Sequence, residues 1–283
     1  LKGAHSTSIT GSALLRNDEE RSKTMSEENI VVVAVDGSEA AKTAVRWAAN
    51  TALKRNVPLR IAACYTMPQF LYAEGMVPPQ ELFEELQNET MQTVDEARAI
   101  ATEVAPDIKI GYTIAEGTPI DMLLEMSKTV TMIVLGSRGL GGLSGMVMGS
   151  VSAAVVSHAQ CPVVVVREDN HVTEVNKYGP VVVGVDGSDV SAQATDFAFA
   201  EAQARNARLI AVHTWMDMQV QASLAGLAAA QQEWNVVEQE QTELLQSRLE
   251  PLLEKYPEVE VEMVITRDRP IRALVDAAAD AQL

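Results

Sequence analysis

The chain has 283 residues, of which 47% are hydrophobic and 22% charged, a composition typical of globular proteins that bury sizeable cores. Its length exceeds that of one ordinary domain and favours two compact units. Lysine and arginine number 22 against 39 aspartates and glutamates, and the net charge of −17 repels nucleic-acid phosphates and anionic lipids. We expect neither nucleic acid nor membrane as a partner, although short-range backbone N–H groups can still bind a small anion such as a nucleotide.

The cysteines indicate the compartment. The sequence has two, Cys64 and Cys161, each inside an apolar strand-like run, which predicts buried thiols in a reducing environment rather than a disulfide framework. No apolar stretch approaches the ~18 residues that span a bilayer. We therefore expect a cytoplasmic protein.

The amino-terminal residues 1–28 carry no pattern of a fold. Residues 1–24 are polar, lack periodicity and lack the apolar core of a secretory signal, while Met25 followed by Ser-Glu-Glu-Asn resembles a natural start. We expect a disordered leader or an artefact of start-site assignment, with a docking tail as the alternative.

Residues 29–168 alternate between strand and helix patterns. A β-branched run at 30–35 is typical of a parallel strand buried on both faces, and Ser38 supplies an N-cap for the helical apolar spacing that follows. The further elements in chain order are strand 59–65, helix 80–104, strand 108–114, a helix from Pro119, strand 132–135, helix 150–158 and strand 163–166. This alternation predicts an α/β fold with a five-stranded, mostly parallel sheet between helices. Its ligand crevice should lie at the carboxyl ends of the strands, where the winding reverses.

A second copy of the unit follows a polar linker at 169–179. Val-Asp-Gly-Ser occurs at Asp36 and again at Asp186, about 150 residues apart, and the match holds without gaps through strand, helix and next strand. The second domain, 180–283, repeats strand 181–185, helix 189–204, strand 208–214, helix 230–250, strand 259–265 and a helix start at Pro270. Leu283 then aligns with Met132, so about 35 residues with the fourth and fifth strands and the loop after them have no counterpart. We expect an incomplete second unit.

The strand at 132–135 leads into the spacing G-x-x-G-x₉-G-S, formed by Gly136, Gly139, Gly149 and Ser150. Glycine lets main-chain N–H groups approach a phosphate, often at positive φ, where a Cβ would obstruct. Gly149 and Ser150 open a helix whose unpaired N–H groups and positive dipole end favour an anion. The alternative is a merely flexible connection.

Side chains near this loop could add to phosphate binding. The hydroxyls of Ser150 and Ser152 are candidate donors, and Arg138 could reach the terminal phosphate. Other glycine motifs are excluded: no Gly-Lys is followed by Ser or Thr as a P-loop requires, and the first strand is followed by Asp-Gly-Ser rather than G-x-G-x-x-G.

Asp36 ends the first strand and has two interpretations that the sequence leaves open. Its carboxylate could hold ribose hydroxyls or a phosphate-bound Mg²⁺, or Asp-Gly-Ser could simply form a turn that caps a helix. Catalytic constellations are not apparent. The four histidines are scattered through the sequence, at His5, His158, His171 and His213, so we predict no metal cluster, no nucleophilic triad and no enzyme.

The repeated Val-Asp-Gly-Ser and the G-x-x-G-x₉-G-S spacing resemble the universal stress protein family in its tandem-domain, ATP-binding form. The resemblance covers residues 29–166 and, as far as they go, 180–283. It implies two tandem units of a Rossmann-like, adenine nucleotide alpha hydrolase-like fold, and a cytosolic ATP-binding protein in stress response or growth control.

The resemblance also implies roles for single residues. Asp36, Gly37 and the backbone of Cys64 would frame adenine and ribose. The phosphates would be surrounded by Gly136, Gly139, Gly149, Ser150, Val151 and Ser152. In the second copy Asp186 and Thr214 take the corresponding places, but a second ATP site cannot be complete. The final strand commonly helps such domains to pair, so a homo-oligomer, such as a dimer, and pairing within the chain both stay open.

Three functions follow as hypotheses. The first is a regulatory module that binds ATP, with or without Mg²⁺, and passes its state to a regulatory protein whose identity the sequence does not give. The second is a slow ATPase or a nucleotide-dependent transferase that uses Asp36, a metal ion and Arg138. The third is an interaction scaffold whose sheet mediates dimerisation without nucleotide.

Overall fold

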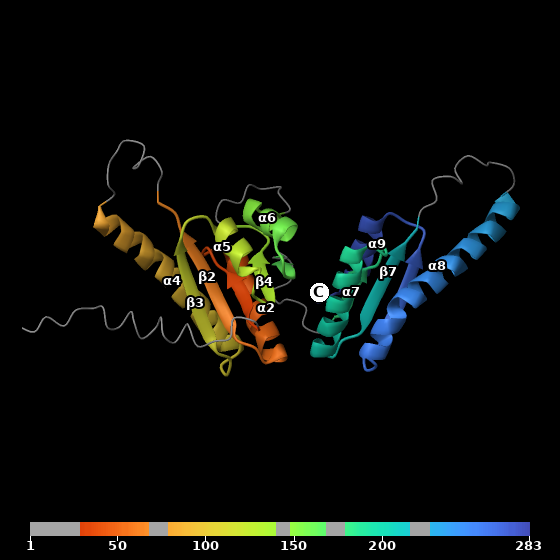
Figure 1. Cartoon of the computed structure of the whole chain (residues 1–283), viewed down its shortest axis with the longest axis horizontal. Coiled ribbons are helices and arrows are strands. Elements are labelled where there is room, and N and C mark those ends of the chain that lie inside the picture. The colour runs from red at the N-terminus through yellow and green to blue at the C-terminus, as the bar shows by residue number, and fades with distance from the viewer. Residues whose placement is uncertain (1–28, 68–78, 140–147, 168–178, 216–226) are drawn as a thin grey trace, which may run out of the picture. The chain divides into compact units, whose positions relative to one another are not determined.

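The computed structural model describes residues 29–67, 79–139, 148–167, 179–215 and 227–283. The described residues form two compact units on either side of the segment 168–178 (Figure 1). The predicted leader, most of the predicted linker and the middle of the glycine loop lie outside the described residues. Each unit is an α/β fold, as predicted.

The first unit contains one five-stranded sheet in the order β3-β2-β1-β4-β5, and every strand pair in it is parallel. The strands are β1 (Val31–Ala34), β2 (Leu59–Tyr65), β3 (Ile110–Glu116), β4 (Met132–Gly136) and β5 (Val163–Val166). Strand β3 begins two residues later than predicted, because Ile108 still belongs to a turn in which its N–H donates to the carbonyl of Ala105 at 3.4 Å. The predicted sheet is confirmed.

Helices cover both faces of this sheet (Figure 1). They are α2 (Glu39–Arg55), α4 (Gln80–Val104), α5 (Pro119–Met126) and α6 (Ser150–His158). Helix α2 packs against α4, and α5 packs against α6. The Ser38 Oγ accepts the Ala41 N–H at 3.2 Å at the start of α2, and Asn56 ends the helix with a left-handed φ of 52°.

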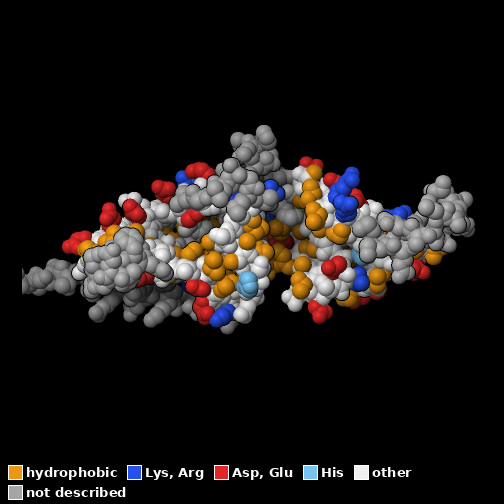
Figure 2. Space-filling model, turned by 90° about the horizontal axis from the view of Figure 1, so that it is seen from above, with side chains coloured by type: hydrophobic (Ala, Val, Ile, Leu, Met, Phe, Trp, Pro, Cys, Tyr) orange, Lys and Arg blue, Asp and Glu red, His pale blue; other side chains and the backbone are white. Residues whose placement is uncertain are grey.

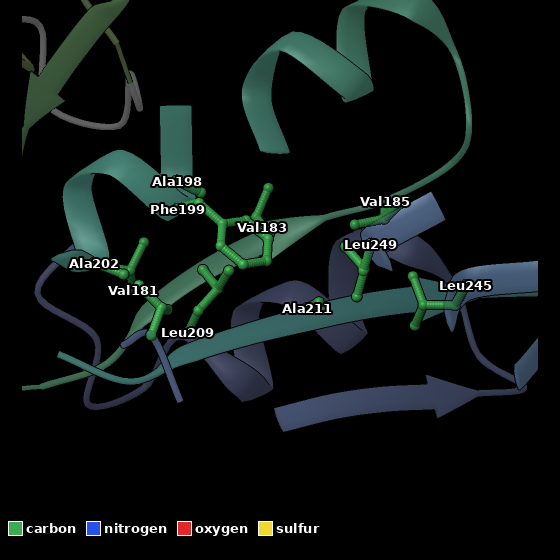
Figure 3. Close-up of a cluster of buried hydrophobic side chains, with 11 residues drawn as sticks. Val181, Val183, Val185, Ala198, Phe199, Ala202, Leu209, Ala211, Leu245 and Leu249 are labelled. Atoms are coloured by element: carbon green, nitrogen blue, oxygen red, sulfur yellow. The ribbon is translucent and has the colours of Figure 1, made fainter. Parts of the chain in front are cut away.

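The second unit has a three-stranded parallel sheet in the order β6-β7-β8. Its elements are β6 (Val181–Gly184), α7 (Asp189–Arg205), β7 (Leu209–Thr214), α8 (Leu227–Lys255), β8 (Val261–Thr266) and α9 (Pro270–Ala277). Between α7, α8 and the sheet lies a core around the fully buried Phe199, Leu209, Leu245 and Leu249 (Figure 3). Phe199 also stacks on Tyr256, with ring centroids 5.7 Å apart.

The last two residues lie against β6 as the start of β4 lies against β1. The Gln282 N–H donates to the Pro180 carbonyl at 3.0 Å, and the Val182 N–H donates to Leu283 at 2.9 Å. In the first unit the Thr131 N–H donates to Ile30 at 3.1 Å. The described residues of the second unit contain no further counterpart of β4, α6 or β5, so this sheet is the smaller one.

Apolar side chains lie on the surface of both units (Figure 2). On α9, Ile271 is 80% exposed and Val275 is 64% exposed, whereas the matching Ile120 and Leu124 of α5 are partly buried. Among the described residues, no helix is long and apolar enough to cross a membrane.

A buried ion pair lies within α7, and its arginine also contacts a carboxyl-terminal residue. Glu201 and Arg205 approach to 2.8 Å with side chains that are 1% and 3% exposed. The Arg205 guanidinium also donates to Gln282 Oε1 at 3.3 Å. Removing one charge would leave the other buried without its counter-charge.

We predict that Glu201→Gln lowers the free energy of unfolding of the second unit by about 3–5 kcal/mol, because the Arg205 cation loses its buried counter-charge. Glu262→Gln is the control, since Glu262 pairs with Arg208 at 2.8 Å on a half-exposed surface and should contribute less than about 1 kcal/mol. Urea denaturation followed by circular dichroism measures both. Equal losses of unfolding free energy in the two variants would show that burial of the Glu201–Arg205 pair does not determine how much it contributes to stability.

Candidate functional site

The sheet order of the first unit brings two loops to the same edge of the sheet. Strand β1 pairs with β2 on one side and with β4 on the other, so the connections after β1 and β4 leave in opposite directions. Ligands of open parallel sheets bind at such a switch point, at the carboxyl ends of the strands. Asp36 follows β1 and the glycine loop follows β4, so the two predicted features meet at this edge.

Asp36 both forms a turn and borders the glycine loop. Its Oδ1 accepts the Ser38 N–H at 3.0 Å, which is the turn-forming interpretation. Its Oδ2 faces Gly139, where an added Cβ would lie only 2.5 Å from this oxygen. The turn itself requires Gly37, whose φ is +85°. One oxygen of this carboxylate therefore forms the turn, and the other faces the glycine loop; the ligand-binding interpretation stays a prediction.

Gly136 and Gly139 are the loop glycines at which the close approach of another element leaves no room for a Cβ, whereas Gly149 has room. A Cβ on Gly136 would lie 2.7 Å from the carbonyl carbon of Ala40, inside the first turn of α2. Gly149 has a φ of −72° and room for a Cβ, with its nearest neighbour, the Ser137 oxygen, at 3.6 Å. Among the described residues, Gly136, Gly139 and Gly149 are not at positive φ.

Helix α6 begins without a capping side chain. Its N-cap is Gly149, and no side chain caps the helix, whereas serine and threonine hydroxyls cap α2 and α5. The first-turn N–H groups of α6 have no acceptor within the helix by its geometry, and they carry the positive end of the dipole. They belong to Ser150, Val151 and Ser152. The anion site at this helix end stays a prediction.

Two groups predicted to face the phosphates have other partners. The Gly149 N–H donates to the Ser137 carbonyl at 2.8 Å and so closes the base of the loop. The Ser152 hydroxyl is buried and donates to the Gly136 carbonyl at 2.8 Å. In this structure the Ser152 hydroxyl holds the start of the loop, and its expected part in phosphate binding stays a prediction. Ser150 is exposed at the helix start.

Sequence reasoning missed the part that Ser137 and Ser38 play in the loop. Ser137 is 3% exposed, and its N–H donates to the Val166 carbonyl at 2.9 Å. Ser38, expected only as a cap, also donates its hydroxyl to the Arg138 carbonyl at 3.4 Å. The Arg138 side chain is partly exposed beside them. No local pattern could reveal these partners, which lie far apart in sequence.

Cys64 lies near the carboxyl end of β2, in register with Ala115. The N–H groups of Val31 and Val35 donate to Pro58 and Ala62, so alternate β2 residues, Cys64 included, direct their backbone groups toward β1. This backbone is therefore on the crevice side. The Cys64 Sγ lies 3.4 Å from the Met122 Sδ.

Neither thiol is poised as a nucleophile. Burial raises the pKa of the Cys64 thiol, and burial raises the pKa of Cys161 to about 11. Both therefore stay protonated at neutral pH, and a protonated thiol reacts poorly. Both are free cysteines, as expected.

The second unit repeats the turn but not its surroundings. The Ser188 N–H donates to Asp186 Oδ1 at 2.8 Å, and this hydrogen bond holds the pKa of the Asp186 carboxyl below its usual range. Gly187 has the same φ of +85° as Gly37. Here the Arg248 guanidinium covers the turn, 2.2 Å from where a Gly187 Cβ would be. Thr214 ends β7, and the described residues bring no glycine loop to Asp186.

The described ranges contain no group of three or more histidine, cysteine, aspartate or glutamate side chains that could hold a metal ion. Asp36 is the carboxylate of the crevice. Mg²⁺ is commonly bound by one or two carboxylates together with substrate phosphates and water. The site therefore fits a cation that arrives with a nucleotide and does not fit a metal held by the protein alone.

The universal stress protein family profile matches residues 29–167 and 177–283. The chain therefore belongs to the universal stress protein family, with two such domains in tandem. It is 40% identical over 261 residues to the universal stress protein Rv2005c of Mycobacterium tuberculosis, covering 89% of this chain and 84% of that protein. It is 36% identical over 267 residues to Rv1996 of the same organism, covering 89% and 83%.

A solved structure shares the fold. A universal stress protein from Archaeoglobus fulgidus aligns with 89% of this chain and 81% of its own, with a TM-score of 0.59 and 17% identity. This likeness supports the tandem α/β architecture.

We predict that Gly136→Ala lowers the free energy of unfolding of the first unit by about 1–3 kcal/mol, because the new methyl group meets the backbone of Ala40. Gly149→Ala is the matched control in the same loop. It has room for the methyl group and should cost less than about 1 kcal/mol through its poorer capping. Thermal unfolding of both variants tests this, and a larger loss for Gly149→Ala would contradict it.

Proposed function

We propose that the first unit binds an adenine nucleotide, ATP in particular, and that the protein acts as a nucleotide-dependent regulator in stress response or growth control. One observation carries the proposal: the Asp36 carboxylate faces Gly139 of the glycine loop, and the helix that follows this loop, α6, begins without a side-chain cap at the switch point of the sheet. A nucleotide has both kinds of group that such a site recognises, sugar hydroxyls and phosphates.

Each group of the proposed site would bind a different part of the nucleotide. The first-turn N–H groups of Ser150, Val151 and Ser152 would bind phosphate oxygens, and the Arg138 side chain would reach the terminal phosphate. Asp36 beside Gly37 would accept a ribose hydroxyl or share a nucleotide-borne Mg²⁺. The Cys64 backbone would bind the adenine edge. Gly136, Gly139 and Gly149 would form the wall of the phosphate site.

The energetics favour binding of moderate strength. Hydrogen bonds to a charged group contribute about 1.5–3 kcal/mol each, and association costs about 4–15 kcal/mol. With the burial of adenine, an affinity on the order of micromolar is expected. A regulator that reports nucleotide levels needs such a reversible affinity.

Binding without turnover is the better-supported function. Phosphoryl transfer requires a positioned base and charge clamps. Of the four histidines, His158 and His213 are described. The His158 ring bonds to the Ala154 carbonyl within α6, and the His213 ring bonds to Val185 and Gln241 within the second unit. Slow hydrolysis through Asp36 and a nucleotide-free scaffold are the competing functions.

We propose the organisation of the chain on the same footing. Residues 29–168 and 180–283 would be the two domains and 169–179 their linker, which the division into two compact units supports. The free cysteines suit a reducing compartment, so we propose the cytoplasm. The partner that reads the nucleotide state would be a protein, with the domains pairing within the chain or between copies.

Mass spectrometry of nucleotide released from freshly purified protein, together with calorimetric titration with ATP and Mg²⁺, tests the function. We expect a co-purified adenine nucleotide, micromolar binding with one site per chain, and little phosphate release. Release of phosphate that Asp36→Ala abolishes would favour the ATPase. Absence of any ATP binding by the full chain would favour the scaffold.

We predict that Gly149→Ser stabilises the empty protein and weakens its binding of ATP. A serine at this N-cap fits the space and can accept a first-turn N–H of α6, which stabilises a helix relative to glycine by about a few tenths of a kcal/mol. The same N–H is then no longer available to a phosphate. Thermal unfolding without ligand and calorimetry with ATP measure the two effects, and a variant that binds ATP more tightly than wild type would refute the assignment of α6.

A further inference from the structure

Ser38 forms hydrogen bonds to both helix α2 and the glycine loop. Its hydroxyl oxygen accepts the Ala41 N–H at 3.2 Å, and the hydroxyl donates to the Arg138 carbonyl at 3.4 Å. The first bond caps α2, and the second reaches the front of the glycine loop, 100 positions along the chain. An N-cap needs only the first bond.

The second bond fixes the direction of a peptide group. No described peptide bond is cis, so in the peptide between Arg138 and Gly139 the C=O and N–H point in opposite directions. Because the carbonyl points to Ser38, the Gly139 N–H points away from α2. The Gly139 nitrogen lies 3.8 Å from where a Cβ of Gly149 would be, next to the start of α6.

Three neighbouring contacts hold the same segment. The Ser137 N–H donates to Val166, the Ser137 carbonyl accepts from Gly149, and the Asp36 carboxylate lies against the Gly139 Cα. These contacts fix the position of the segment. They do not set the orientation of the Arg138–Gly139 peptide, whose carbonyl accepts the hydrogen bond from Ser38.

We propose that Ser38 is a positioning residue of the phosphate site, which directs the Gly139 N–H toward the same anion as the first turn of α6. The inference rests on the proposed nucleotide binding and adds a donor and the residue that aims it. Ser38 acts through the peptide and does not itself contact the phosphate.

The second unit supplies a matched control. The Ser188 hydroxyl accepts the Ser191 N–H at 3.1 Å and caps α7 as Ser38 caps α2. No glycine loop lies beside it in the described residues. Ser38→Ala and Ser188→Ala therefore remove the same kind of cap, and Ser38→Ala alone also releases a loop carbonyl.

The test compares ATP with adenosine, which has the same base and sugar without phosphates, in calorimetric titrations of the full chain. We expect Ser38→Ala to weaken ATP binding by about threefold to tenfold, the range of one hydrogen bond, while adenosine binding changes less than about twofold. At 3.4 Å the bond to Arg138 is long for a hydroxyl donor, which argues for the lower part of this range.

Two further variants complete the design. Ser188→Ala should lose a similar amount of thermal stability and leave ATP affinity within about twofold of wild type, and Ser38→Thr, which keeps a hydroxyl, should restore ATP binding. Equal losses for ATP and adenosine, an equal ATP loss in Ser188→Ala, or wild-type ATP affinity in Ser38→Ala would overturn the inference and leave the proposed function intact. Failure of the wild-type chain to bind ATP would overturn both.

Discussion

The close approach of the end of β4 to the turn between β1 and α2 is the constraint on which the first unit depends. A Cβ on Gly136 would lie 2.7 Å from the Ala40 backbone, and one on Gly139 would lie 2.5 Å from the Asp36 carboxylate. The absent side chains let adjacent parallel strands end against the start of a helix. The same absence leaves this backbone segment without side chains of its own, as the proposed nucleotide site requires.

The two units show how one turn serves two different surroundings. Asp-Gly-Ser adopts the same φ of +85° at Gly37 and Gly187, and in both places serine caps the helix that follows. In the first unit the turn borders the glycine loop, and in the second the Arg248 guanidinium covers it. The local motif is therefore a structural device, and the element packed against it differs between the two units.

Regular elements were predictable from the sequence, while partners in space were not. The β-branched runs and the Ser38 cap define the strands and α2, because these signals depend on near neighbours in the chain. The Gly149 N–H and the Ser152 hydroxyl were expected to face phosphates, yet they bond to Ser137 and Gly136. Buried hydrogen-bond donors are almost always paired, but the fold decides which acceptor lies within reach, and no spacing rule identifies it.

The sequence by itself determined the duplication, the alternation of strands and helices, and the positions of Asp36 and the glycine loop at strand ends. It determined these because residue type fixes backbone preference and hydrophobic period over a few neighbouring residues. Only the tertiary structure decided that β1 and β4 are adjacent, that Asp36 faces Gly139, and that Arg138 bonds to Ser38. Those contacts join residues about 100 positions apart, and such pairings depend on the packing of the whole sheet rather than on any local preference.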